Sequence, residues 1–180
     1  MSFVVHGQYL KSPSDIILSK TSLRKTLFEA NFQRIFVFNE ISFWFKSREY
    51  YVIKQRDKDI ESFKVSIKKR KNFRLGRTKS QRINIDTKKV LRVIDYMDSV
   101  GFWSFSGDSL NLDSKANPNG GMLTISVFDG SSYEFEMIND SARVLISVTN
   151  PEPRQRFVPT QQRAIFINCK NDLFDLFKKN

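Results

Sequence analysis

Residues 122–151 read MLTISVFDGSSYEFEMINDSARVLISVTNP and carry the clearest structural pattern in the chain. Apolar and polar residues alternate in this stretch, as they do on a strand with one buried face. Asp129-Gly130 lies between two alternating runs and is a strong β-hairpin signal. Asn139-Asp140-Ser141 predicts a second turn, because Asn and Asp side chains bond to the backbone of tight turns. We therefore expect a three-stranded antiparallel meander over residues 122–149, ended by Pro151.

The remaining elements extend this meander to an α+β fold. Four stretches rich in aromatic and β-branched residues are predicted to be short strands, namely RIFVF from residue 34, ISFWFK from 41, YYVIKQ from 50 and SFKVSIK from 62. Helices are predicted within 13–31, over 86–101 and over 165–177, and residues 104–121 are predicted to form a loop. The expected order is α-βββ(β)-α-βββ-α, with antiparallel sheet and helices packed on it.

Length and composition predict a single domain over residues 1–180, with residues 1–12 as a mobile segment. The chain is 40% hydrophobic and has 17 Phe residues, which is enough apolar surface for a packed core. A single cysteine allows no intramolecular disulfide, which fits a reducing compartment. No signal peptide is visible, although one could have been removed, and the most apolar run, 35–45, is too short for a transmembrane segment. We therefore expect a soluble, cytoplasmic protein.

Positive charge is concentrated in the middle of the chain. The net charge is +11, and residues 46–92 hold 17 Lys or Arg against 5 Asp or Glu. Within the basic segment 64–92, residues 68–82 read KKRKNFRLGRTKSQR, with eight cations and no acidic residue. Such an asymmetry predicts an anionic partner. The residues expected to contact it are Lys68, Lys69, Arg70, Lys71, Phe73, Arg74, Arg77, Lys79 and Arg82.

Two kinds of partner fit this basic surface. We expect a non-enzymatic protein-binding module of the inhibitor or immunity type, whose cations engage an acidic protein partner. The alternative is a nucleic-acid-binding protein, with arginines on DNA or RNA phosphates and Phe73 stacked on a base. No helix-turn-helix, zinc finger or other sequence-reading element accompanies the basic segment. A solvated basic hairpin tip or loop without any partner is the plainest interpretation.

Residues that could support catalysis are few, so we expect neither an enzyme nor a cofactor. His6 is the single histidine and no Cys-x-x-Cys pair exists, which argues against a zinc site. A Cys169–His6 dyad is conceivable, but Cys169 lies on an apolar helix face, where cysteine usually packs as a small hydrophobe. Neither the serine-nucleophile spacing nor the phosphate-loop spacing is present.

A metal-dependent enzyme built on carboxylates is a third hypothesis. Glu134 and Glu136 alternate with apolar residues and so share one strand face, and Asp129 lies at the preceding turn. The favoured interpretation is that these carboxylates form the solvated face of a half-buried strand. Trp44 and Trp103 are expected to pack in the core, as large aromatic side chains usually do.

Overall fold

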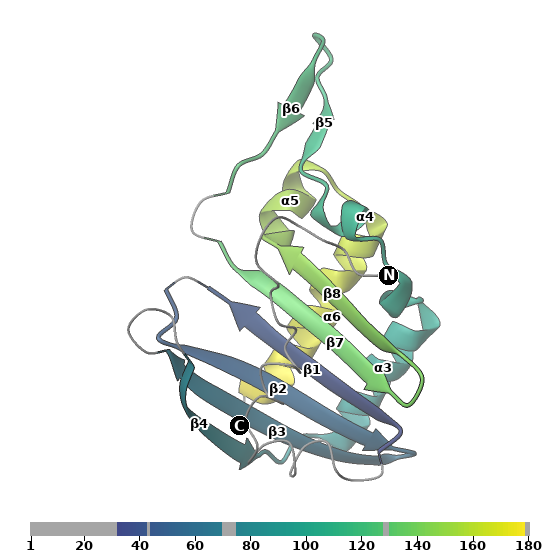
Figure 1. Cartoon of the computed structure of the whole chain (residues 1–180). Coiled ribbons are helices and arrows are strands. Elements are labelled where there is room, and N and C mark those ends of the chain that lie inside the picture. Colours follow the sequence, from purple (N-terminus) through teal and green to yellow (C-terminus); the bar gives the residue numbers. More distant parts are fainter. Residues whose placement is uncertain (1–31, 43, 70–74, 128–129, 179–180) are drawn as a thin grey trace.

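The structure of this chain is a computed structural model that describes residues 32–42, 44–69, 75–127 and 130–178 (Figure 1). The helix expected within 13–31 and the mobile segment expected over 1–12 lie outside these residues. His6 and Asp129 lie outside them as well.

Six strands of the described chain form one antiparallel sheet. Their order is β4-β3-β2-β1-β7-β8, with bounds β1 Arg34–Ile41, β2 Ser47–Arg56, β3 Asp59–Lys69, β4 Leu75–Arg82, β7 Ser132–Asn139 and β8 Arg143–Thr149. β1 lies between β2 and β7 and is central, which fits its aromatic and β-branched sequence. The α+β prediction is confirmed.

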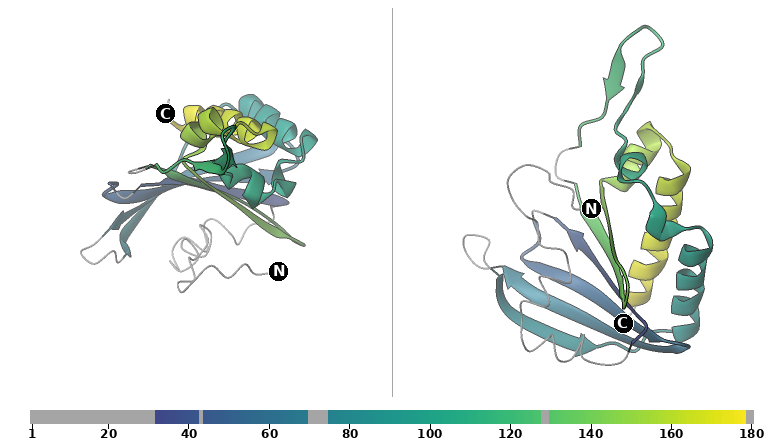
Figure 2. Two further views of the ribbon diagram at one scale, coloured as in Figure 1. Left: turned by 90° about the horizontal axis from the view of Figure 1, so that it is seen from above. Right: turned by 45° about the vertical axis from the view of Figure 1, so that its right-hand side comes forward.

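All described helices cover the same face of this sheet (Figure 2). They are α3 Thr87–Ser99, the 3-10 helix η2 Phe102–Ser104, α4 Gly107–Asn111, α5 Pro151–Phe157 and α6 Gln161–Lys178. The helices predicted over 86–101 and 165–177 are therefore confirmed as α3 and α6. Asp86 caps α3 by accepting a bond from the Lys89 N–H. Gly101, with φ of 64°, follows the end of α3 in the left-handed conformation that favours glycine.

Aromatic side chains dominate the core between the sheet and the helices. On the sheet side Phe38 stacks on Phe135, with ring centroids 5.6 Å apart. On the helix side Phe174 meets Phe38 edge to face at 5.9 Å, and Phe166 meets Phe135 at 5.1 Å. Such pairs contribute beyond the apolar area that they bury. This cluster fixes α6 across the centre of the sheet.

A second apolar cluster lies on the opposite face of the sheet and includes Val37, Tyr50, Val52, Val65 and Ile67. Within β3, Val65 and Ile67 lie on this apolar face, and Lys64, Ser66 and Lys68 lie on the other. The apolar side of β3 nevertheless faces away from the helices, because Val65 pairs with Tyr50 rather than with Tyr51. The polar side of β3 therefore lies on the helix side.

The predicted meander is wrong in its first strand. Residues Met122–Thr124 form β6, which pairs with β5, Ser114–Ala116, in a separate hairpin that projects from the body (Figure 1). β7 pairs instead with β1, which lies far away in the sequence. A Cβ on Gly130 would lie 1.5 Å from Oδ1 of Asn150, so close packing explains this glycine. The turn predicted at Asn139 is confirmed, since its side chain accepts bonds from the N–H groups of Ser141 and Ala142.

Two further predictions are corrected. Among the described residues of ISFWFK, only Ile41 belongs to a strand, and Trp44, Phe45 and Lys46 lie between β1 and β2. The stretch 104–121 contains α4 and β5, whose short lengths gave no periodic signal. The sequence left open whether the basic stretch forms a loop or a hairpin, and the structure pairs β4 with β3 over most of the length of β4.

Candidate functional site

The structure places the predicted partner-binding residues on two faces of the β3–β4 pair. The Lys68 and Lys79 side chains are exposed on the helix-side face, and Arg82 is exposed on the opposite face. Arg82 forms an ion pair with Glu61 at 3.2 Å. The structure describes only the backbone of Lys69 and Arg77, and the other predicted contact residues, Arg70, Lys71, Phe73 and Arg74, lie outside the described chain.

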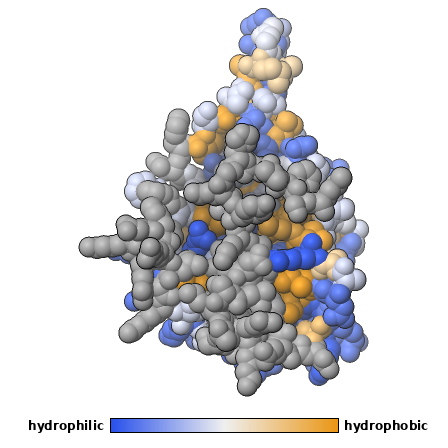
Figure 3. All heavy atoms as spheres, viewed as in Figure 1, coloured by the Kyte–Doolittle hydropathy of each residue, from blue (hydrophilic) through white to orange (hydrophobic). Residues whose placement is uncertain are grey.

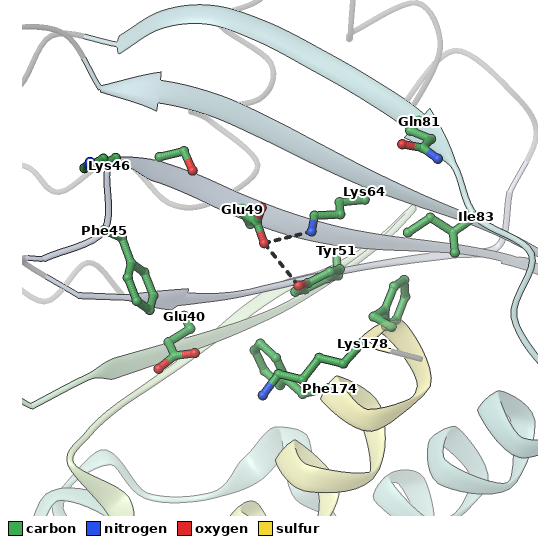
Figure 4. Close-up of a pocket in the computed structure, with 12 residues that line it drawn as sticks. Glu40, Phe45, Lys46, Glu49, Tyr51, Lys64, Gln81, Ile83, Phe174 and Lys178 are labelled. Carbon is green, nitrogen blue, oxygen red and sulfur yellow. Dashed lines mark hydrogen bonds and ion pairs between the residues drawn. The ribbon is translucent and has the colours of Figure 1, made fainter. Parts of the chain in front are cut away.

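A pocket of about 570 Å³ opens on the helix-side face next to these lysines (Figure 4). It forms because α6 covers β1 and β2 but leaves β3 and β4 uncovered on that side (Figure 2). Its aromatic lining consists of Phe45, Tyr51, Phe174 and Phe177. Its charged lining consists of Lys46, Lys64, Lys178, Glu40 and Glu49.

The carboxylates of this pocket are engaged by neighbouring side chains. Glu49 pairs with Lys64 at 2.9 Å and accepts a bond from the Tyr51 hydroxyl at 3.4 Å (Figure 4). Burial, with the Glu49 charge, raises the pKa of Tyr51 to about 12. Glu40 accepts a bond from the Tyr133 hydroxyl at 3.1 Å. Within the described chain, Lys46 and Lys178 form no ion pair and so leave positive charge at the pocket.

An exposed aromatic turn borders the pocket. Trp44 is 64% exposed and Phe45 is 42% exposed, and Lys46 follows them directly before β2. The prediction that Trp44 packs in the core is therefore wrong, whereas Trp103 is partly buried and stacks on Phe36 at 5.7 Å. Trp44 is exposed because β1 ends at Ile41, before the chain turns back into β2. Exposed Trp and aromatic residues are enriched at the energetic centres of protein interfaces.

The carboxylate hypothesis is only partly consistent with the structure. Glu134 and Glu136 do share the face opposite the helices, but Glu136 is fully buried and pairs with Arg143. The expected solvated face is therefore wrong at Glu136, whose buried carboxylate is paired with a cation of the neighbouring strand β8. Burial raises the pKa of Glu134, and the Arg48 charge opposes this shift. Among the described residues, no three His, Cys, Asp or Glu side chains are grouped to hold a metal ion.

Cys169 packs as the sequence predicted. It is fully buried in the helix-side core, and burial raises the pKa of its thiol to about 12. The thiol is therefore protonated at neutral pH and shielded from solvent. His6 lies outside the described chain, so the structure does not test the Cys169–His6 dyad.

A second exposed apolar feature lies on the projecting β5–β6 hairpin. Met122 is 65% exposed and Leu123 is 38% exposed. Figure 3 shows hydrophobic side chains on this hairpin, beneath a polar tip. Exposed apolar side chains on a protruding element are a common feature of protein-binding surfaces. This hairpin lies at the end of the molecule away from β4 (Figure 1).

Sequence reasoning missed the pocket and the aromatic turn. The pocket joins residues from β1, β2, β3 and α6, which are adjacent only in the folded chain. The aromatic turn could have been recognised, because Phe43, Trp44 and Phe45 are consecutive. Three consecutive apolar residues do not fit a strand with one buried face, which requires alternation.

No described helix has both the length and the apolar content needed to cross a membrane.

Comparison of the chain with protein-family models, with curated protein sequences and with solved structures found no match in any of the three. The function of this chain must therefore be inferred from its own residues.

Proposed function

We propose that this chain is a protein-binding module of the inhibitor or immunity type, which engages an acidic protein partner through the helix-side face of β3 and β4. The observation that carries the proposal is the exposed turn of Trp44, Phe45 and Lys46 beside a pocket with aromatic walls. Lys68 and Lys79 extend the positive charge from this pocket along the sheet. Aromatic anchors surrounded by charge are typical of protein interfaces.

The same surface suits nucleic acid less well. Glu40 and Glu49 line the pocket, and carboxylates there would repel a phosphate backbone. Glu49 also neutralises Lys64, which reduces the charge available for phosphate contacts. A protein partner can instead place apolar side chains against Phe45 and Phe174 and acidic side chains near Lys46 and Lys178. Charge complementarity of this kind orients a protein partner and speeds its association.

The test compares two labelled polyanions of equal charge, a peptide that alternates glutamate with phenylalanine and a single-stranded oligonucleotide, by fluorescence anisotropy at low and at physiological salt. Salt weakens the ionic contacts of both probes. We expect the peptide to stay bound at physiological salt, because its phenylalanines also pack against the aromatic lining of the pocket, and the oligonucleotide to dissociate. Stronger oligonucleotide binding at physiological salt would support the nucleic-acid alternative and overturn the proposal.

Matched charge reversals assign the binding to a surface. The variant Lys68→Glu/Lys79→Glu changes the proposed site, and Lys88→Glu/Arg92→Glu makes the same charge change on the exposed side of α3. We expect the first variant to lose at least about tenfold in peptide affinity and the second to lose much less, because interface charges act over short range in salt. Equal losses would show that only net charge matters.

A further inference from the structure

The two edge strands of the sheet differ in how their outer backbone groups are satisfied. At the β8 edge, the side-chain amide of Asn111 donates to the Ser147 carbonyl at 3.0 Å and accepts from the Thr149 N–H at 3.1 Å. Asn111 therefore takes the place of a neighbouring strand at this edge. At the β4 edge, no described element pairs with the outer side.

The register identifies which β4 backbone groups face outward. The Ile83 N–H donates to the Ser62 carbonyl at 2.8 Å, which makes this a hydrogen-bonded pair of the antiparallel ladder. Such pairs alternate with non-hydrogen-bonded pairs, so Gln81 and Lys79 also bond inward to β3. Thr78, Ser80 and Arg82 therefore direct their N–H and C=O groups away from the sheet.

This edge is accessible, and its side chains are cationic or polar. Lys79, Ser80, Gln81 and Arg82 are all exposed. Lys79 and Gln81 face the helix side, where Gln81 also lines the pocket. A strand added beside β4 would thus run along the rim of the pocket and place alternate side chains next to Lys79.

We propose that β4 binds an extended acidic segment of the protein partner as an additional strand of the sheet. This inference rests on the proposed function and names its binding mode. Backbone bonds to Thr78, Ser80 and Arg82 would provide affinity, and acidic side chains opposite Lys79 would provide specificity. A second copy of this chain fits poorly, because its own β4 would place like charges opposite one another.

The probe is a capped peptide of alternating valine and glutamate, and its control is a peptide of equal charge that alternates proline and glutamate. Proline lacks the N–H that strand addition requires. We expect the valine peptide to bind and to slow amide hydrogen exchange at Thr78, Ser80 and Arg82. The inward amides of Lys79 and Gln81 should change little, because β3 already protects them. This measurement uses the unaltered full chain.

Two variants at one position separate backbone from side-chain contributions. Ser80→Pro removes one outward N–H, whereas Ser80→Ala removes only the hydroxyl. We expect Ser80→Pro to weaken the valine peptide by about tenfold, and Ser80→Ala to leave its affinity nearly unchanged. Circular dichroism of both variants checks that the sheet remains folded.

The outcomes distinguish the binding mode from the function. Equal binding of both peptides, with no exchange protection at the outward amides, overturns strand addition and leaves an acidic partner in place. Failure of both peptides to bind overturns the mode and the proposed function together. Sedimentation that shows self-association through β4 in the absence of peptide would overturn the mode in favour of a second copy.

Discussion

The two edges of the sheet show two ways of ending a β-sheet. At β8 the chain supplies its own cover, since Asn111 of α4 bonds to the outer groups of Ser147 and Thr149. At β4 the described chain supplies no cover, and exposed cations occupy the strand. Unpaired edges invite association with other strands, and proteins limit it by covering the edge or by charging it. Asn111 thus covers the end of β8 that lies next to α4, whereas no described side chain or strand covers the outer side of β4 in this way.

The cover at β8 depends on one buried cation. Arg163 is fully buried on α6, and its guanidinium donates to four backbone carbonyls, those of Ser109, Leu110, Leu112 and Val158. Three of these carbonyls lie in or just after α4, where the helix leaves its last carbonyls without intrahelical donors. Arg163 therefore fixes α4, and α4 presents Asn111 to β8.

The largest effect is expected when this support is removed. Arg163→Leu keeps an apolar stem but removes the described donor of three carbonyls, because only the Ser109 carbonyl keeps a second donor, the Thr160 hydroxyl. A buried carbonyl without a partner costs about 1–3 kcal/mol, so we expect the free energy of unfolding to fall by about 3–5 kcal/mol. Urea denaturation measures this loss. Arg163→Lys keeps the charge but supplies fewer donors, so its free energy of unfolding should lie between those of the unaltered chain and of Arg163→Leu. A loss below about 1 kcal/mol for Arg163→Leu would contradict the role assigned to Arg163.

Two proline substitutions in β4 test which of its backbone groups face outward. Gln81→Pro removes an N–H that bonds to β3, so we expect it to destabilise the fold by about 2–3 kcal/mol. Ser80→Pro removes an outward N–H, so its effect on the free energy of unfolding should stay within about 1 kcal/mol. Chemical denaturation of both variants makes the comparison. If Ser80→Pro proves the more damaging of the two, the assigned register of β4 is wrong.

Local sequence patterns predicted the elements better than their pairing. Asp86, Gly101 and the apolar spacing of α3 and α6 are local signals, and the structure confirms each helix. The partner of β7 is not a local property, because β1 lies about a hundred residues earlier in the chain and competes with the nearer β6. The Asp129-Gly130 pair indicated a hairpin that the fold does not form, since Gly130 serves close packing against Asn150.

Of the candidate site, the sequence predicted only the positive charge and not the position of its side chains. Clustered lysines and arginines identified the basic segment, but alternation alone could not show that Lys64 and Lys68 lie on the helix side. That placement follows from the pairing of β2 with β3, which puts Val65 beside Tyr50 on the opposite face. Trp44 was misjudged because a large aromatic residue in an apolar run usually packs inside. The three consecutive aromatic residues at 43–45 contradicted that interpretation in the sequence itself.

Removal of the edge cover itself should have a moderate effect. Asn111→Ala loses both bonds to β8, and we expect a loss of about 1–2 kcal/mol in the free energy of unfolding. The Thr149 amide should also exchange faster with solvent, which hydrogen exchange measures directly. Asn111→Asp keeps the oxygen that accepts from Thr149 but loses the donor to Ser147, so it should protect Thr149 better than Asn111→Ala does. Equal exchange in both variants would show that Asn111 does not cover this edge.

The smallest effect on stability is expected at the charged edge, where it is coupled to a change in association. Lys79→Val/Arg82→Val removes two exposed cations from β4, including the one paired with Glu61. Exposed ion pairs contribute little, so the free energy of unfolding should change by less than about 1 kcal/mol. The outward N–H and C=O groups remain, and with two of its three cations removed β4 repels a second β4 strand less.

We therefore expect this variant to self-associate with rising concentration in analytical ultracentrifugation, while the unaltered chain does not. Lys88→Val/Arg92→Val makes the same charge change on α3, away from the edge, and should not self-associate. If both variants associate equally, reduced net charge is the cause and the β4 edge has no special role. If neither associates, charge is not what keeps β4 apart from other strands, and the contrast between the two edges would rest on Asn111 alone.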